Sequence, residues 1–368
     1  MLSRTSTGKL KHRIHAGFSL IEMMVTLLIA MVILSGVFQV LVASKRSELD
    51  HQEIVYIQEN ARFALDVLSR DIRMAGYFGC AQQTEQVNVI KQTIVGGIGT
   101  AGLRGYDGVG KVTSHIVYGE NAKAGTDALM IQRGDDEHEY LVREQSPSTN
   151  TITVWQQHNF QVNQPLALVD GNCRFSALFT ASQIDTPNTI VHAQSENNCS
   201  DILRGRYDCR DCRTNHCPRA LPKTPYLSGS RIMPLISNAY FIGDSSLLEG
   251  APALMRQSIT VQQGRLTTRI EELATGVENI QFIYGVDTQN TGAINEYRSA
   301  VDMDINADGV IDSRDWQHVK AVKIDMLLVS KSPVFTEPRT VVFNGIEYPG
   351  LFMRQIVSTT VHIRNYGA

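Results

Sequence analysis

The chain has 368 residues, of which 43% are hydrophobic and 19% are charged. This balance excludes a largely disordered chain, and a mean hydropathy of −0.13 excludes a protein with many membrane spans. The net charge of −3 and the pI of about 6.4 exclude a chain that is basic throughout, as many nucleic-acid-binding proteins are.

Residues 1–17 form a basic segment ahead of a long apolar run. The segment contains four Lys or Arg residues and no acidic residue, so the positive-inside rule places it in the cytoplasm. From Met23 to Ala43 no residue is charged, and a helix of this length spans roughly 30 Å, the thickness of a bilayer core. The run is longer than the apolar region of a secretory signal peptide. Residues 18–44 are therefore predicted to form a transmembrane helix.

Glu22 is the only charged residue in this apolar run. A carboxylate costs about 2.5–3.5 kcal/mol at the centre of a bilayer, and less near the interface. A simple membrane anchor gives no reason for this cost. Glu22 is therefore a candidate functional residue that needs a partner of opposite charge.

The segment Gly17-Phe18-Ser19-Leu20-Ile21-Glu22 resembles the class III signal of type IV pilins and type II secretion pseudopilins. The resemblance implies that a prepilin peptidase cuts after Gly17, removes residues 1–17 and methylates the new N-terminal residue, Phe18. It also implies that Glu22 meets the N-terminal amine of a neighbouring subunit. Two charges in a helical core are tolerated as a pair and costly singly, which agrees with that role.

Polar residues follow Ser44, but the helical spacing of apolar residues continues through 45–76. These residues are Ile54, Ile57, Ala61, Leu65, Leu68 and Ile72. They form one stripe of an amphipathic helix, and Gly76 and Gly79 favour its end. One helix is therefore predicted from about Phe18 to about Ala75. Its charged residues are expected mostly on the solvated side: Arg62, Asp66, Arg70, Asp71 and Arg73.

Segments near both ends of the chain resemble the PilW family of minor pilins. They are Glu59–Ala64, Arg70–Cys80, Ile280–Asp287 and Trp316–Ile324. The resemblance implies a role in priming pilus assembly and in the tip complex. The implied partners are other minor pilins, the major pilin, a PilY1-type tip adhesin, the prepilin peptidase and the inner-membrane platform protein.

The same resemblance implies two successive locations. Before assembly, the protein would cross the bacterial inner membrane once through residues 18–44, with its head in the periplasm. After assembly, it would lie at the pilus tip, on the cell surface. Residues 81–240 have no such resemblance.

Residues 77–368 are predicted to form one globular head. Residues 96–110 are rich in glycine and favour a flexible loop. Short segments typical of strands include His115–Tyr118, Ala128–Gln132, Thr151–Trp155, Phe160–Val162, Ser258–Gln262, Ile280–Val286, Ala321–Val329, Thr340–Phe343 and Arg354–Arg364. Strands after one long helix predict an α+β fold. The expected form is type IV pilin-like, with the helix packed on an antiparallel sheet that carries a large insertion.

All six cysteines lie in the predicted head: Cys80, Cys173, Cys199, Cys209, Cys212 and Cys217. The even number and an oxidising compartment favour disulfides, with fifteen possible pairings that the sequence leaves open. A zinc site at Cys209, Cys212, His216 and Cys217 is the less favoured alternative. Its second half follows after only three residues, which crowds a tetrahedral site.

The segment Asp304–Asp315 has the spacing of a calcium-binding loop. Asp304, Asn306 and Asp308 alternate, Gly309 allows a sharp turn, and Asp312 occupies the ninth position. The carbonyl of Val310 adds a ligand at position seven. Asp315 closes the set where an EF-hand has Glu, a difference that resembles dockerin-type loops. The sequence therefore predicts a structural Ca²⁺ site, with a metal-free acidic turn as the alternative.

Several functional alternatives stay open. A type II secretion pseudopilin resembling the J subunit is disfavoured by the length of the head and by the PilW-like segments. A pilus-tip adhesin or binding module that acts through region 81–240 is a further alternative, and the sequence does not decide whether this region contacts nucleic acid. The chain lacks the G-x-S-x-G and H-E-x-x-H motifs, so an enzyme is not expected. Motility (twitching), DNA uptake and adhesion remain open as roles of the pilus.

Overall fold

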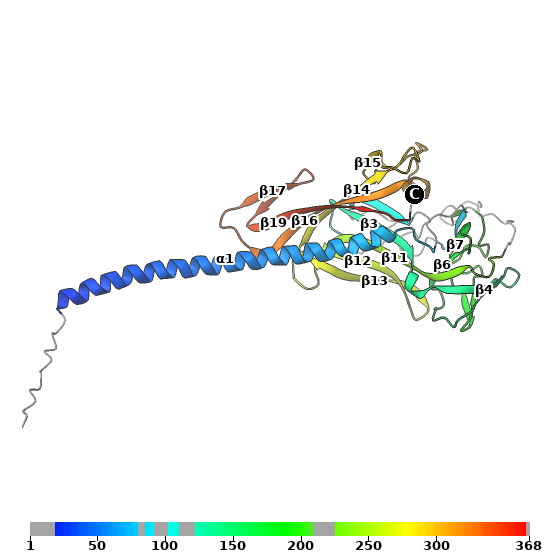
Figure 1. The fold of residues 1–368 in the computed structure, drawn as a ribbon, viewed down its shortest axis with the longest axis horizontal. Helices are drawn as coiled ribbons and strands as arrows, with labels where there is room; N and C mark the ends of the chain where they lie inside the picture. Colours follow the sequence, from blue (N-terminus) through cyan, green and yellow to red (C-terminus); the bar gives the residue numbers. More distant parts are fainter. Residues whose placement is uncertain are drawn as a thin grey trace, which may run out of the picture. The chain divides into compact units, whose positions relative to one another are not determined.

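The structure is a computed structural model, and it describes residues 19–79, 85–91, 102–109, 122–205, 207–208 and 225–365. The chain divides into two compact units, Met1–Gln52 and Glu53–Ala368. Figure 1 shows the elements, whose bounds in chain order are α1 Leu20–Met74, β1 Glu85–Asn88, β2 Leu103–Val109, β3 Thr126–Gly134, the 3₁₀ turn η1 Asp136–His138, β4 Tyr140–Ser146, β5 Thr151–Val154, β6 Pro165–Val169, β7 Phe175–Thr180, β8 Gln183–Thr186, β9 Thr189–Val191, β10 Tyr207–Asp208, β11 Arg231–Asp244, β12 Pro252–Gln262, β13 Arg265–Thr275, β14 Val277–Val286, β15 Glu296–Arg298, α2 Ser313–Trp316, β16 Val319–Pro333, β17 Arg339–Phe343, β18 Ile346–Gly350 and β19 Phe352–His362.

The helix α1 confirms the predicted single long N-terminal helix (Figure 1). Its first part, up to Gln52, belongs to the first unit and exposes large apolar side chains such as Leu28 and Phe38. By length and composition, α1 is able to cross a membrane. A continuous apolar surface of this size needs a lipid bilayer or packed apolar helices to cover it.

The second part of α1 belongs to the second unit and buries one stripe. The buried apolar residues are Ile57, Ala61, Ala64, Leu68 and Ile72. They lie in one hydrophobic core with residues of β14, β16 and β19 and of β3, β11 and β12. The spacing of three or four residues that predicted the stripe is therefore the spacing that the fold buries.

Asp71 corrects one expectation about this half of the helix. The sequence places it with the solvated charges, but only 6% of its surface is exposed. Its carboxylate accepts hydrogen bonds from Asn238 at 2.7 Å and from Tyr240 at 2.5 Å, and it pairs with Arg133 at 3.5 Å. Burial and the nearby carboxylate raise the pKa of Tyr240, so its hydroxyl remains a donor. Asp71 therefore joins α1 to β3 and β11.

The larger sheet contains thirteen of the described strands and centres on β11. The first residues of β11 pair with β4 and β6, and the following ones pair with β3 and β12. A separate core fills the part of the head between residues 87 and 232, around Val142, Leu168 and Phe179. This part covers most of residues 81–240, the region in which the sequence shows no resemblance to the PilW family.

A second sheet has the strand order β15-β14-β16-β19, and β17 pairs with β18 in a hairpin. All strand pairs in both are antiparallel. In the larger sheet, β1 pairs in parallel with β7 and β10. The predicted α+β architecture is confirmed, with these two parallel pairs as an addition to the antiparallel sheet.

Two local expectations are wrong, and one cannot be compared. Within the glycine-rich segment, Leu103–Val109 forms β2, where Gly105 leaves space that the Tyr284 ring occupies. The segment Phe160–Val162 is not a strand, because Phe160 packs in an aromatic cluster with His158 and Tyr140. The expected strand His115–Tyr118 lies outside the described residues.

Asp127 joins the two sheets through a second buried carboxylate. It is 3% exposed and accepts the backbone N–H groups of Gly108 in β2 and Phe282 in β14, both at 2.9 Å. Burial raises the pKa of Asp127 to about 6, although the two N–H donors act in the opposite direction. The folded protein therefore holds a proton there at a pH at which the unfolded chain has released it.

We expect Asp71→Ala to lower the free energy of unfolding by about 3 kcal/mol, because the buried groups facing it lose their partner. Denaturant titration of the full-length protein in detergent micelles measures the change. Asp66→Ala is the matched control, because Asp66 lies on the same helix and forms an exposed pair with Arg70, which contributes less than about 1 kcal/mol. Equal effects of the two substitutions would contradict the role given to Asp71.

The Asp127 carboxyl predicts a pH dependence of stability. Because its pKa is higher in the folded state than the ordinary value of 3.8, the folded protein binds more protons between pH 4 and pH 6. The free energy of unfolding should therefore fall as the pH rises through this range, by roughly 2–3 kcal/mol. Unfolding measured at pH 4, 5, 6 and 7 tests this, and Asp127→Asn should remove this contribution. A variant with an unchanged pH profile would refute it.

Candidate functional site

The processing and assembly residues lie at the start of the chain. Gly17 and Phe18 lie outside the described residues. Glu22 lies in the first turn of α1 and is exposed, and its carboxylate accepts the backbone N–H of Ser19 at 3.4 Å. The carboxylate is therefore placed one turn into the helix, where another chain is able to reach it.

The acidic loop, residues 304–315, lies between β15 and β16 and ends in the short helix α2. Apolar residues on both sides hold it against the main core. Met303 and Trp316 are fully buried, and Ile305 and Ile311 pack on the same core. The Trp316 ring meets the Tyr284 ring edge-on at 4.9 Å between centroids. The loop is thus fixed at both ends while Asp308 and Gly309 remain exposed.

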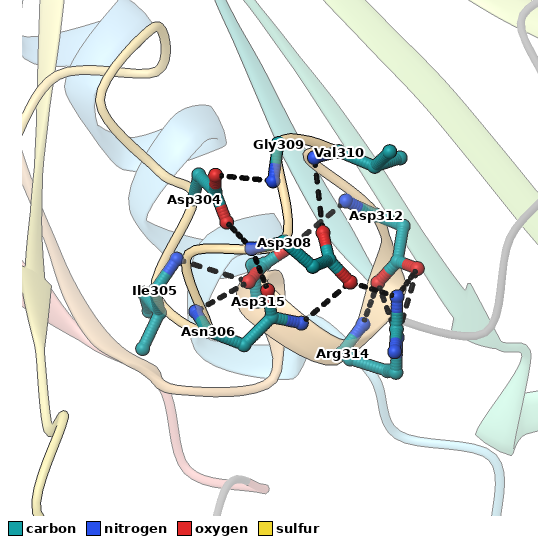
Figure 2. A network of polar contacts seen from close by, with 9 residues as sticks. All are labelled: Asp304, Ile305, Asn306, Asp308, Gly309, Val310, Asp312, Arg314 and Asp315. Carbon is teal, nitrogen blue, oxygen red and sulfur yellow. Dashed lines mark hydrogen bonds and ion pairs between the residues drawn. The ribbon is translucent and has the colours of Figure 1, made fainter.

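Backbone N–H groups bind most of the loop's carboxylate oxygens (Figure 2). Asp304 accepts the N–H groups of Asp308 at 3.2 Å and Gly309 at 2.9 Å. Asp315 is 1% exposed and accepts the N–H groups of Ile305 at 3.0 Å and Asn306 at 3.4 Å. These bonds curl the chain around the Asp304 and Asp315 carboxylates, and Nδ2 of Asn306 donates to Oδ2 of Asp308 at 3.1 Å.

Asp312 and Asp315 also form the N-terminal cap of α2. Asp312 accepts the N–H of Arg314 at 2.7 Å, and Asp315 accepts the N–H of Asp312 at 2.9 Å, which makes a reciprocal capping box. The side chains at positions nine and twelve are therefore positioned by the same helix start.

Arg314 places a positive charge inside the loop, as Figure 2 shows. Its Nη2 lies 2.6 Å from Oδ2 of Asp308 and 2.7 Å from Oδ2 of Asp312. Hydrogen bonding to Asp312 and the charges of both carboxylates raise the pKa of Arg314 further, so it is a permanent cation. The guanidinium thus bridges the fifth and ninth positions. Sequence reasoning missed this residue, although a basic residue two positions after Asp312 is a visible signal.

The donor set of the loop is chemically suited to a hard cation, because every side chain offers oxygen. The candidates are Asp304, Asn306, Asp308, Asp312 and Asp315, with the carbonyl of Val310. In the structure, the carboxylate oxygens of this set instead interact with the Arg314 guanidinium and with backbone N–H groups. Among the described residues, no group of three or more His, Cys, Asp or Glu side chains is close enough to hold a metal ion. A metal ion would therefore have to displace Arg314.

The cysteine predictions fall mostly outside the described residues, which exclude Cys80, Cys209, Cys212 and Cys217. Cys173 and Cys199, the two cysteines that are described, are both disulfide-bonded and neither is a free thiol. The described residues do not show which cysteine each of them is bonded to. The pairing stays a prediction, as does the assignment of the 209–217 cluster to disulfides instead of zinc.

Comparison with known proteins supplies two family matches. Residues 12–38 match the prokaryotic N-terminal methylation motif. Residues 239–365 match the type IV pilus-assembly protein W family. The protein is a PilW-like type IV pilin. No curated protein and no solved structure matches the chain.

Of the segments that the sequence singled out in this PilW-like pilin, the two matches include the class III signal, Ile280–Asp287 and Trp316–Ile324, but not Glu59–Ala64 or Arg70–Cys80. The methylation motif contains Gly17, Phe18 and Glu22, and the apolar start of α1 fits a membrane-anchored pilin. The family match runs from β11 to the residues after β19 and includes the acidic loop. Proteins of this family are structural components of a type IV pilus, and the matches support a minor pilin.

Proposed function

We propose that this minor pilin helps to prime assembly of a type IV pilus and remains in its tip complex. The observation that carries the proposal is the presence, in one chain, of a methylation motif and a PilW-type head. The head exceeds 280 residues, a bulk that suits the end of a fibre better than its repeating shaft. Its partners would be other minor pilins, the major pilin, a tip adhesin of the PilY1 type, the prepilin peptidase and the inner-membrane platform protein.

The mechanism depends on the apolar part of α1. The mature subunit would wait in the inner membrane with its head in the periplasm, and would leave the bilayer when its apolar helix packs against those of other subunits. Glu22 would then lie in a helical core away from water. Pairing with the N-terminal amine of a neighbouring subunit compensates both charges, whereas a single buried charge is strongly unfavourable.

Mass spectrometry of sheared surface fibres tests the proposed place of the protein. Recovery at low abundance together with pilus proteins is the expected result. Recovery only with components of a secretion apparatus would instead identify a pseudopilin. Loss of surface pili in a deletion strain, restored by the intact gene, would support the priming role.

We expect Glu22→Ala to reduce recovery in sheared fibres about tenfold or more, since one unpaired buried charge costs several kcal/mol. Cleavage of the leader should continue, as seen from the size of the protein on an immunoblot. Glu48→Ala is the control, because Glu48 is exposed on the same helix beyond the apolar run. Normal incorporation of the Glu22 variant would argue against the pairing mechanism.

We also propose that the acidic loop binds Ca²⁺ and thereby stabilises the connection between β15 and β16. The support is the twelve-residue spacing, the oxygen-only donor set and the fixed ends of the loop. Arg314 would have to swing out of the loop when Ca²⁺ enters, and the exposed position of its side chain makes this movement possible. The role would be structural, at the millimolar calcium concentrations found outside cells.

Asp304→Ala should abolish stabilisation of the head by Ca²⁺, because it removes the ligand at position one. For the wild type, 2 mM Ca²⁺ should raise the melting temperature by about 2–6 °C relative to EDTA. Differential scanning calorimetry of the full-length protein in detergent, with Mg²⁺ as the control ion, measures this. A wild-type melting temperature that is the same in Ca²⁺ and in EDTA would disprove the site.

Arg314→Gln tests whether the Arg314 guanidinium and Ca²⁺ compete for the same carboxylates. Without Ca²⁺ this variant should melt at a lower temperature than the wild type, because Asp308 and Asp312 then repel each other. With Ca²⁺ it should bind the ion more tightly, because no guanidinium competes.

A further inference from the structure

The outer edge of β19 offers a free row of backbone hydrogen-bonding groups. Within the described residues, β19 is the last strand of its sheet and pairs with β16 alone, beside which it runs in Figure 1. The pairing is regular from Arg354 to His362. The N–H of Ile363 donates to Lys320 at 2.9 Å. Backbone hydrogen bonding in an antiparallel pair alternates from one residue to the next. The N–H and C=O groups of odd-numbered residues of β19 therefore bond to β16, and those of even-numbered residues point outward from the edge, away from β16.

Arg364, the next even-numbered residue after β19, shows what the outward N–H groups of this edge lie beside. The N–H of Arg364 donates to the carbonyl of Arg73 in α1 at 3.1 Å. At its C-terminal end, the edge therefore meets the chain's own helix. Farther back, residues 356, 358, 360 and 362 make no such outward backbone hydrogen bond within the described residues, which leaves this part of the edge for another strand.

This edge lacks the features that usually keep sheet edges from pairing with other chains. Such edges are short, charged, bulged or interrupted by proline. The opposite edge of the same sheet, β15, has three residues and includes Glu296 and Arg298. The stretch from Gln355 to Val361 has no Lys, Arg, Asp, Glu or Pro and consists mainly of β-branched residues. A long, regular edge without protection suits pairing with a partner strand.

A groove between β19 and α1 lies next to this edge. Its volume is about 500 Å³. Ala61 and Leu65 of α1 and Val357 of β19 supply apolar surface, and Gln58, Ser69 and Gln355 border it. The side chains of a strand added to β19 would alternate between this groove and the opposite face of the sheet. The backbone edge and the groove are thus two independent parts of one surface.

The charges around the groove favour an acidic partner. Arg62, Asp66 and Arg73 line it, and Asp66 already pairs with Arg70 at 3.3 Å. Neither Arg62 nor Arg73 has an acidic partner in the part of the chain that the structure describes. Two positive charges therefore remain to attract carboxylates from outside.

We propose that an extended acidic strand of a neighbouring pilin subunit adds to the edge of β19 and places alternate side chains in this groove. The groove follows α1 from Gln58 to Arg73, roughly 22 Å, so the partner strand has about seven residues. Backbone hydrogen bonds supply affinity, and the groove supplies selectivity for small apolar and acidic side chains. The proposal depends on the chain being incorporated with other pilins, as proposed above.

Thr360→Pro tests the backbone part of the proposal. Proline removes the outward N–H and leaves the bonds to β16 intact, because residue 360 does not bond to that strand. We expect recovery in sheared fibres to fall about tenfold at an unchanged amount of full-length protein in the membrane. Thr360→Ala, which keeps the N–H, should behave like the wild type. Equal recovery of the two variants would overturn the proposal.

A photoreactive phenylalanine analogue at Gln355 provides a test that does not depend on proline. In cells that assemble pili, it should cross-link to an acidic, extended segment of another pilin, and mass spectrometry locates that segment. The same analogue at Leu247, an exposed turn residue outside the groove, is the control. A cross-link to a second copy of this chain, a cross-link to a protein that is not a pilin, or no cross-link would each overturn the proposal.

These outcomes can be distinguished from failure of the proposed function. If the wild-type protein is absent from sheared fibres, the proposed function fails. If the wild type is present and the proline variant is recovered equally, only the inference about β19 fails.

Discussion

The packing of the second half of α1 on the head is the constraint on which the rest of the structure depends. A stripe of small and branched residues, including Ala61 and Ala64, lets the helix approach the sheets closely. Asp71 then fixes the position along the axis. Sliding the helix by one turn, 5.4 Å, would leave the Asp71 carboxylate without Asn238 and Tyr240, and a buried charge without partners costs several kcal/mol.

This arrangement also explains how one helix serves two environments. From Met23 to Ala43, α1 is apolar around its whole circumference, as a membrane or a bundle of helices requires. The second part is apolar on one face only. Because buried hydrogen bonds to the head specify its orientation, the helix does not depend on general hydrophobicity for its register. The apolar first part is thereby left for lipid or for other subunits.

The sequence predicted what periodicity and spacing encode. The apolar run and the stripe predicted the helix, and the short segments typical of strands predicted most strands around the core, including β14, β16 and β19. Asp71 was beyond such reasoning, because its partners Asn238 and Tyr240 lie 167 and 169 residues away. The glycines of β2 suggested a loop for a similar reason, since the ring that Gly105 accommodates belongs to a distant strand.

The acidic loop shows the same limit on a smaller scale. Its spacing predicted that the side chains of Asp304 and Asp308 converge on a cation, whereas the Asp304 carboxylate accepts the backbone N–H of Asp308. Spacing did not predict that Arg314 would pair with Asp308 and Asp312, because the direction of that side chain depends on the turn of α2. Short-range patterns thus locate a group of ligands, whereas the state of the group depends on the three-dimensional start of a helix.

The course of β11 suggests how such a large head is organised. Its first residues, Arg231–Pro234, pair with β4 and β6 beside a separate core, and the residues from Leu235 onward pair with β3 and β12 beside the core of α1. The family match begins at residue 239, after this change of partners. Since the two cores share no residue and the core of α1 uses none from 140 to 203, the part from β4 to β9 is able to change its surface without disturbing the packing of α1. One strand, β11, thus takes part in the strand pairing beside both cores.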